Sequence, residues 1–404
     1  MGLIFTKLLS KSDFKSQSIF YIGSTFIYQL TNFINLYVLN AYLQDTFFAK
    51  FILIQNLASV FGMIVLMGMN PNSISILLKN NPVNKIYSSY FITIILNSLV
   101  LYISCLIFIK TLRFSFDFSF FICLFYLIVS IENSLSYLAI AELKTSLIMV
   151  VSIFRFVMLP ALIFTAIEPA SLQGVLLSYC LAGLGSSLIY FIGLQVRINK
   201  SVDFKFFYTR TTLEINLPFF ISNISVVLSE YVLNKMLFSF EGGAQYIRVN
   251  TILKQLTNLL LFVPNKTLFL MVPKMLKANE SADKSERMLY VNITIYIVLV
   301  VLFLLFRNSI YGYYHFPNSA GINLLAILFF LWGLLSIGNQ YLGNRLIISG
   351  KHLIRNAADI ILAITNVLVF WILIHSFPKF AYVIASIVSF LIINLFLIYR
   401  VRKI

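Results

Sequence analysis

Residues 145–167 read TSLIMVVSIFRFVMLPALIFTAI and contain one charged side chain, Arg155. A helix of about 20 apolar residues crosses the hydrocarbon core of a bilayer. The stretch therefore predicts a membrane-spanning helix with an arginine near its middle. A charge at that depth costs about 2.5–3.5 kcal/mol on insertion scales, so it needs a partner or a water-filled cavity.

The whole chain has the same character. Of its 404 residues, 60% are hydrophobic and 11% are charged, whereas soluble domains have about 45–50% and 25%. This composition excludes a soluble globular protein and a disordered chain, and it leaves no room for a large catalytic domain outside the membrane. We predict an all-α integral membrane protein with 12 spans, at residues 18–39, 48–69, 87–109, 116–139, 145–167, 171–194, 217–238, 244–271, 288–306, 318–338, 356–377 and 380–399.

The basic residues predict the orientation. The chain has 30 Lys and Arg against 14 Asp and Glu. If the loops alternate across the membrane, 20 of these cations lie on the side that holds both termini, and four lie on the other side: Lys110, Arg113, Arg307 and Lys379. Cytoplasmic loops carry the excess of Lys and Arg in membrane proteins. Both termini are therefore predicted to be cytoplasmic, and the net charge of +16 does not indicate nucleic acid as a partner.

Signatures of enzyme chemistry are missing from the sequence. There is no G-x-x-x-x-G-K-[ST] loop for ATP, and the three cysteines form no C-x-x-C pair. The three histidines are scattered, at His315, His352 and His375, so they suggest neither a metal site nor a catalytic triad. We expect no catalytic residues, no metal and no cofactor.

Polar side chains recur at helical spacing inside the predicted spans. In the seventh span an amide or acid recurs every seven residues, and in the eighth a polar residue recurs every four. These spacings place the groups on one face of each helix. Hydrogen bonding between helices explains single amides, but the number of stripes favours a shared, water-filled cavity. The stripes are Thr25, Gln29 and Asn32; Asn216, Asn223 and Glu230; Asn250, Lys254 and Asn258; and Asp359 and Asn366.

The charged residues within the predicted spans support a cationic cavity, because there are six cations and only three acids. A cavity with surplus positive charge suits phosphate or carboxylate groups, and amides suit sugar hydroxyls. The predicted substrate-binding residues are Arg155, Lys254, Lys235, Arg248, Lys266, Asn32, Asn223 and Asn250, and the predicted ion-coupling acids are Glu230, Asp359 and Glu132.

Structural alternatives exist for three of these cations. Arg155 could form an ion pair with Glu132, and Lys235 could anchor its helix at the membrane interface. Lys50 could extend along its helix to reach the interface.

The two halves of the chain share a short pattern. Ala49-Lys50-Phe51-Ile52 begins the second span, and Ala244-Gln245-Tyr246-Ile247 begins the eighth, 195 residues later. Internal repeats are common in secondary transporters. We therefore expect two six-helix lobes, residues 1–200 and 201–404, around a central cavity.

The chain resembles the polysaccharide-exporter branch of the MATE/MOP superfamily, the Wzx-type O-antigen flippases. The resemblance rests on two patterns. One runs from Leu39-Asn40-Ala41-Tyr42-Leu43 through Phe48-Ala49-Lys50-Phe51 to Met67-Gly68-Met69-Asn70. The other comprises Asn216-Leu217-Pro218, Asn234-Lys235 and Ala244-Gln245-Tyr246. Alanine replaces the usual glycine at Ala49 and Ala244, and Asn40 and Asn234 replace a basic and an acidic residue.

This resemblance implies a MATE-like fold and a role in lipopolysaccharide biosynthesis and polysaccharide transport. The implied function is a flippase in the bacterial inner membrane. It moves an undecaprenyl-diphosphate-linked oligosaccharide to the periplasmic leaflet by alternating access, coupled to protons or sodium. A polysaccharide polymerase and a chain-length regulator are the implied partners. Two alternatives stay open: an O-antigen polymerase, disfavoured by the short predicted periplasmic loops, and a MATE-type small-molecule exporter.

The charge asymmetry makes a direct prediction about topology. Alkaline phosphatase, which is active only outside the cytoplasm, should be active when fused after Glu168 or Asn308. It should be inactive when fused after Lys200 or Lys277. The reverse pattern at two or more of these four sites would overturn the predicted orientation.

Overall fold

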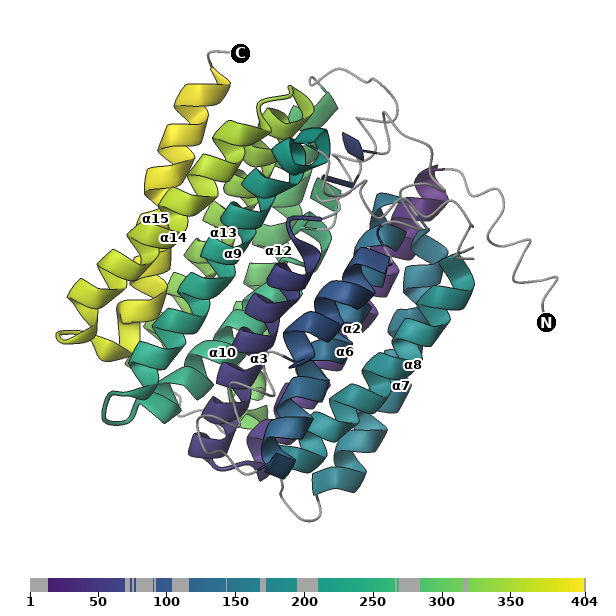
Figure 1. The fold of residues 1–404 in the computed structure, drawn as a ribbon. Coiled ribbons are helices and arrows are strands. Elements are labelled where there is room, and N and C mark those ends of the chain that lie inside the picture. The colour runs from purple at the N-terminus through teal and green to yellow at the C-terminus, as the bar shows by residue number, and fades with distance from the viewer. Residues whose placement is uncertain are drawn as a thin grey trace. The chain divides into compact units, whose positions relative to one another are not determined.

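The computed structural model describes residues 14–69, 73–74, 76–77, 90, 92–103, 116–142, 144–167, 172–194, 210–265, 267–268, 284–314 and 319–402. Within these ranges the chain is helical and has no β-strand (Figure 1). The long helices are α2 (Phe14–Tyr42), α3 (Asp45–Leu66), α6 (Phe116–Ala141), α7 (Thr145–Ile167), α8 (Leu172–Leu194), α9 (Arg210–Phe238), α10 (Gly243–Leu260), α12 (Lys284–Tyr313), α13 (Ala320–Ile348), α14 (His352–Ile374) and α15 (Pro378–Val401).

The prediction of an all-helical membrane protein is confirmed. Nine helices in the described ranges are long and apolar enough to cross a membrane. Helices α2 and α10 occupy the predicted first and eighth spans but are not among the nine, since both carry many polar side chains. Of the predicted third span, the structure describes a shorter apolar helix, Ile92–Ile103. The count of 12 spans stays a prediction.

The predicted eighth span, 244–271, is interrupted: α10 ends at Leu260, and after a turn at Leu261 the chain is helical again from Phe262 to Asn265. Pro264 explains the break, since proline has no N–H to pair with the carbonyl group four residues earlier. Side-chain amides of α13 bind carbonyl groups beyond the break: Gln340 donates to the Asn265 oxygen at 3.1 Å, and Asn344 donates to the Leu268 oxygen at 2.6 Å. These two hydrogen bonds attach α13 to the segment around and beyond Pro264.

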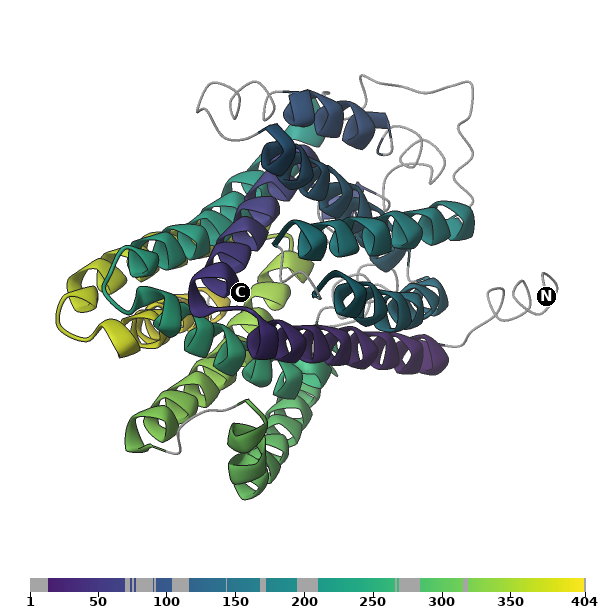
Figure 2. The same ribbon diagram turned by 90° about the horizontal axis from the view of Figure 1, so that it is seen from below.

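The chain divides into two compact units. Unit 1 comprises Met1–Thr31 and Ile54–Ile224, and unit 2 comprises Asn32–Leu53 and Ser225–Ile404. In unit 1, α6, α7 and α8 pack against one another (Figures 1 and 2). In unit 2, α15 packs against α13 and α14, and α10 contacts α12, α13 and α15. The predicted lobes, 1–200 and 201–404, stay a prediction.

Many buried serine and threonine hydroxyl groups bond to the backbone of their own helix. Ser130 donates to the Tyr126 oxygen at 2.7 Å, and Ser389 donates to the Ala385 oxygen at 2.8 Å. Both side chains are fully buried. A serine or threonine therefore satisfies its polar atom without a partner helix. A side-chain amide has more polar atoms to pair, so the buried amides and charges are the polar groups that require explanation.

A close backbone contact in unit 1 makes a prediction about stability. Gly68 has a φ of +81°, and a Cβ atom built on it would lie 2.0 Å from the backbone oxygen of Asn216 in α9. We expect Gly68→Ala to lower the melting temperature of the detergent-purified protein and its level in the membrane. Gly338→Ala is the matched control, because its Cβ would meet only the Asn394 amide at 3.6 Å. Equal behaviour of the two variants would contradict this account.

Candidate functional site

An ion pair lies at the middle of unit 1. Arg155 of α7 donates from Nη1 to Oε1 of Glu132 on α6. The two side chains are only 11% and 8% exposed. Glu132 lies nine residues before the end of α6 and Arg155 ten residues after the start of α7. At 1.5 Å per residue, each is about 15 Å from that end of its helix, near the middle of a span.

The surroundings of this pair leave one hydrogen-bond donor of Arg155, its Nε atom, without an acceptor among the described residues. Its guanidinium group lies 5.6 Å from the centre of the Tyr28 ring, a distance at which a cation is attracted to an aromatic face. Its Nε atom is buried and has no hydrogen-bond partner among the residues that the structure describes. The structure thus contains the ion pair expected as a structural alternative. It also retains a donor on Arg155 that a further acceptor can use.

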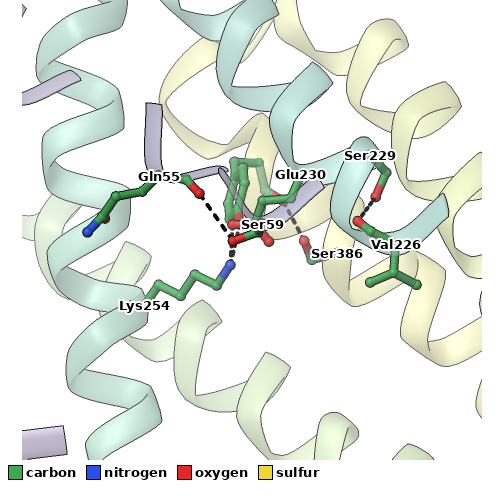
Figure 3. Close-up of polar contacts among 8 residues, drawn as sticks. Gln55, Ser59, Val226, Ser229, Glu230, Lys254 and Ser386 are labelled. Atoms are coloured by element: carbon green, nitrogen blue, oxygen red, sulfur yellow. Dashed lines mark hydrogen bonds and ion pairs between the residues drawn. The ribbon is translucent and has the colours of Figure 1, made fainter. Parts of the chain in front are cut away.

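Three side chains from three helices meet in unit 2. Lys254 of α10 binds Oε1 of Glu230 on α9 and the hydroxyl oxygen of Tyr382 on α15, at 3.1 Å. Tyr382 in turn donates to Glu230 Oε1 at 2.9 Å. Figure 3 shows the Lys254 side chain extending from α10 toward Glu230. We call these residues the Glu230 triad.

The triad also lies well inside its helices. Glu230 is eight residues before the end of α9, and Lys254 is eleven residues after the start of α10. The corresponding distances are about 12 and 16 Å. The Glu230 and Lys254 side chains retain 33% and 24% exposure, so they are more accessible than the pair in unit 1.

Arg248 makes three polar contacts in unit 2. From the second turn of α10, its Nε atom binds the side-chain oxygen of Asn40, Nη2 binds the Asn40 carbonyl oxygen, and Nη1 binds Asp45. Asn40 lies near the end of α2, and Asp45 begins α3. All three nitrogen atoms of the guanidinium group therefore hold the turn between these helices.

A fourth ion pair lies within α14, and its arginine also binds α13. Arg355 binds Asp359 at 2.8 Å and the side-chain oxygen of Asn339 at 2.8 Å. Gly343 provides the space, because a Cβ atom there would lie 2.6 Å from the Arg355 side chain. Asp359, a predicted ion-coupling acid, therefore has a cationic partner on its own helix.

The remaining predicted site residues take part in none of these ion pairs. Lys235 is exposed in the last turn of α9, as expected for an interfacial anchor, and Lys50 is exposed with its ammonium group 5.8 Å from the Phe47 ring. Asn32 and Asn223 are partly buried. Asn250 is 3% exposed, and neither polar atom of its side chain has a partner. Lys266 lies outside the described residues.

The observed ion pairs lower the surplus of positive charge that was expected within the spans. Arg155, Lys254 and Arg248 each bind an acid, so these three cations contribute little net positive charge. Sequence reasoning missed Tyr382, and it did not consider Asp45, Arg355 or Asn339 as partners of buried charges. The spacing of Glu132 and Arg155, nearly equidistant from the turn between two consecutive spans, was a usable signal. The same signal was available for Glu230 and Lys254.

No protein-family model and no curated protein sequence matches this chain. Solved structures do. The MATE multidrug transporter DinF-BH has a TM-score of 0.72 at 18% identity, with 96% of this chain and 94% of that chain covered. This chain has the MATE fold.

Two further structures extend the likeness. A multidrug resistance MATE family transporter of the MOP superfamily, in an outward-facing conformation, has a TM-score of 0.66 at 16% identity, with 96% and 94% of the chains covered. A MOP superfamily transporter from Pyrococcus furiosus, described as having a binding pocket of reversed polarity that suggests a different function, has a TM-score of 0.61 at 14% identity, with 98% and 97% covered. The MATE-like architecture predicted from the sequence is confirmed.

The pair in unit 1 makes a prediction that separates stability from function. Removing one partner of a buried ion pair costs about 3–5 kcal/mol, because the other charge is left alone, whereas removing both is often neutral. We expect Arg155→Met to lower the melting temperature in detergent and the membrane level, and Arg155→Met with Glu132→Gln to restore both. If the double variant is no more stable than the single one, the pair is not the source of the effect.

Proposed function

We propose that this protein is a flippase for undecaprenyl-diphosphate-linked oligosaccharides, the repeat units of O-antigen or a related polysaccharide. It carries them from the cytoplasmic to the periplasmic leaflet of the bacterial inner membrane by alternating access. The shared fold with MATE and MOP transporters over 96% of the chain supports transport. The two ion pairs at mid-span, Arg155–Glu132 and Lys254–Glu230, are the observation that carries the proposal.

Mid-span ion pairs are poor stabilising devices, which favours a functional role. Apolar residues of similar volume often stabilise a protein at least as well as a buried ion pair. Ionisable groups inside a membrane usually mark a substrate or ion path. A cation that holds a carboxylate in one state is able to hold an anionic substrate in another, so each pair provides a partner that substrate can replace.

The chemistry of the two cations suits a diphosphate attached to sugars. The planar guanidinium fork of Arg155 matches phosphate oxygens, and its unpaired Nε is a further donor. Lys254 presents a point charge beside the Tyr382 hydroxyl group. A hydroxyl both donates and accepts, as sugar hydroxyls require.

Glu230 is the proposed coupling residue. It binds both Lys254 and Tyr382, and when substrate engages Lys254 the carboxylate loses its main counter-charge. A proton or a sodium ion then compensates Glu230, which links substrate movement to an ion gradient. Asp359 is the second choice, because Arg355 on its own helix binds it already.

A small-molecule exporter is the second candidate function. The near-neutral balance of the observed pairs favours it, because a polyanionic substrate would gain from unpaired cations. The matching structures include multidrug transporters, but the Pyrococcus furiosus transporter is described as having reversed pocket polarity. The same fold therefore accommodates different cargo. The fold favours a transporter over the polymerase alternative.

Complementation separates these functions. In a strain deleted for the gene, we expect the paired variants Arg155→Met with Glu132→Gln and Lys254→Met with Glu230→Gln to lose most surface polysaccharide at normal membrane levels. Arg155→Lys should retain part of it, because the charge survives without the fork. Polysaccharide is measured by gel and antibody, and protein by immunoblot.

The control is the exposed pair Arg345–Glu286, 3.4 Å apart. Arg345→Met with Glu286→Gln should leave polysaccharide unchanged. Wild-type polysaccharide from both mid-span variants would contradict the proposed substrate path. Drug sensitivity of the deletion strain with intact polysaccharide would favour the exporter.

A further inference from the structure

Arg248 joins three segments of unit 2 at one end of its helices. It extends from α10 to the turn between α2 and α3, where it binds Asn40 and Asp45. The Asn40 side-chain amide also donates to the Tyr314 oxygen, just beyond α12, at 3.4 Å. The charge asymmetry of the loops predicts this end to be periplasmic. We call the contact of Arg248 with Asn40 and Asp45 the outer latch.

The acceptors of the latch, Asn40 and Asp45, each lie at the end of a helix. Asn40 lies in the last turn of α2, where helix carbonyl groups have no partner within the helix, and it is 2% exposed while Arg248 binds it. Asp45 lies in the first turn of α3, where the helix dipole stabilises a negative charge. The Asp45 side chain is 40% exposed and that of Arg248 is 24% exposed. The charged pair of the latch is therefore partly accessible, so Arg248 and Asp45 can separate without either charge entering an apolar environment.

Two buried amides lie deeper than the latch in the same two helices. Asn35 is five residues deeper in α2 than Asn40, about 7.5 Å, and it is 1% exposed. Asn250 is two residues deeper in α10 than Arg248 and is 3% exposed. Within the described part of the chain, neither polar atom of either side chain has a hydrogen-bond partner. Leaving buried polar groups unpaired is costly, so a second state that hydrates them explains why amides occupy these positions.

We propose that Arg248 is a latch that closes the periplasmic end of the transport path, and that Asn35 and Asn250 line the part of this path that opens when the latch releases. The inference rests on the proposed alternating access and adds the outer closing device. In the open state the two amides offer donors and acceptors to water and to sugar hydroxyls. In this structure the latch itself is closed.

The test measures access from outside, with no substrate. Asn35→Cys or Asn250→Cys is introduced as a reporter into a variant whose three native cysteines are replaced by alanine. Spheroplasts are treated with a membrane-impermeant maleimide, and the labelling rate is measured. We expect Arg248→Ala and Asp45→Asn to raise the rate roughly tenfold, since the latch includes hydrogen bonds between charged groups. Arg248→Lys should give an intermediate rate.

Arg307→Ala is the control, because it removes a cation predicted at the same end of the molecule but outside the latch. Labelling after denaturation and the membrane level of each variant report on folding, and Asp45→Asn provides a second test if Arg248→Ala misfolds. Unchanged labelling of both reporters in the two latch variants would overturn the proposal, as would an equal increase in Arg307→Ala. Labelling needs no substrate, so its result tests the latch alone. The latch proposal can therefore be wrong while the flippase proposal holds, and the flippase proposal can be wrong while the latch proposal holds.

Discussion

Charged side chains near the middle of membrane-spanning helices are the main constraint on this structure. A lone charge at mid-span is costly, and Arg155, Glu132, Lys254 and Glu230 all lie there, each bound to an opposite charge. The pairing requires consecutive helices to place their charged residues at nearly equal distances from the connecting turn. It thereby constrains how α6 meets α7 and how α9 meets α10. It also defines the groups that must change partner if the protein moves an anion.

The same constraint separates two classes of polar residue. Serine and threonine side chains such as Ser130 and Ser389 bond to the backbone of their own helix, so they need no polar partner on a neighbouring helix. Amides such as Asn344 bind exposed carbonyl groups near the break at Pro264 and hold α13 against that segment. Asn35 and Asn250 do neither, so they are better explained by a second conformation than by the packing of this one.

Much of the fold was predictable from the sequence, because long apolar runs leave a chain no alternative to membrane-spanning helices. The break at Pro264 was missed because hydropathy alone does not detect a missing backbone donor. The pair of Arg155 and Glu132 was anticipated because both lie in consecutive spans. Tyr382 was not, because its contact with Lys254 joins residues 128 positions apart, and tyrosine in an apolar span gives no signal. The surplus of positive charge expected within the spans was reduced by partners, such as Asp45, that lie at helix ends.

The most direct test of the proposed function is translocation by the purified protein. Proteoliposomes containing a fluorescent undecaprenyl-diphosphate oligosaccharide are treated with an impermeant glycosidase, and the protected fraction is followed over time with and without a proton or sodium gradient. We predict that the wild-type protein exposes the protected fraction faster under one of the gradients, and that Glu230→Gln with Lys254→Met abolishes this response. A protected fraction that decays no faster than in protein-free liposomes, or that responds equally in the variant, would contradict the account.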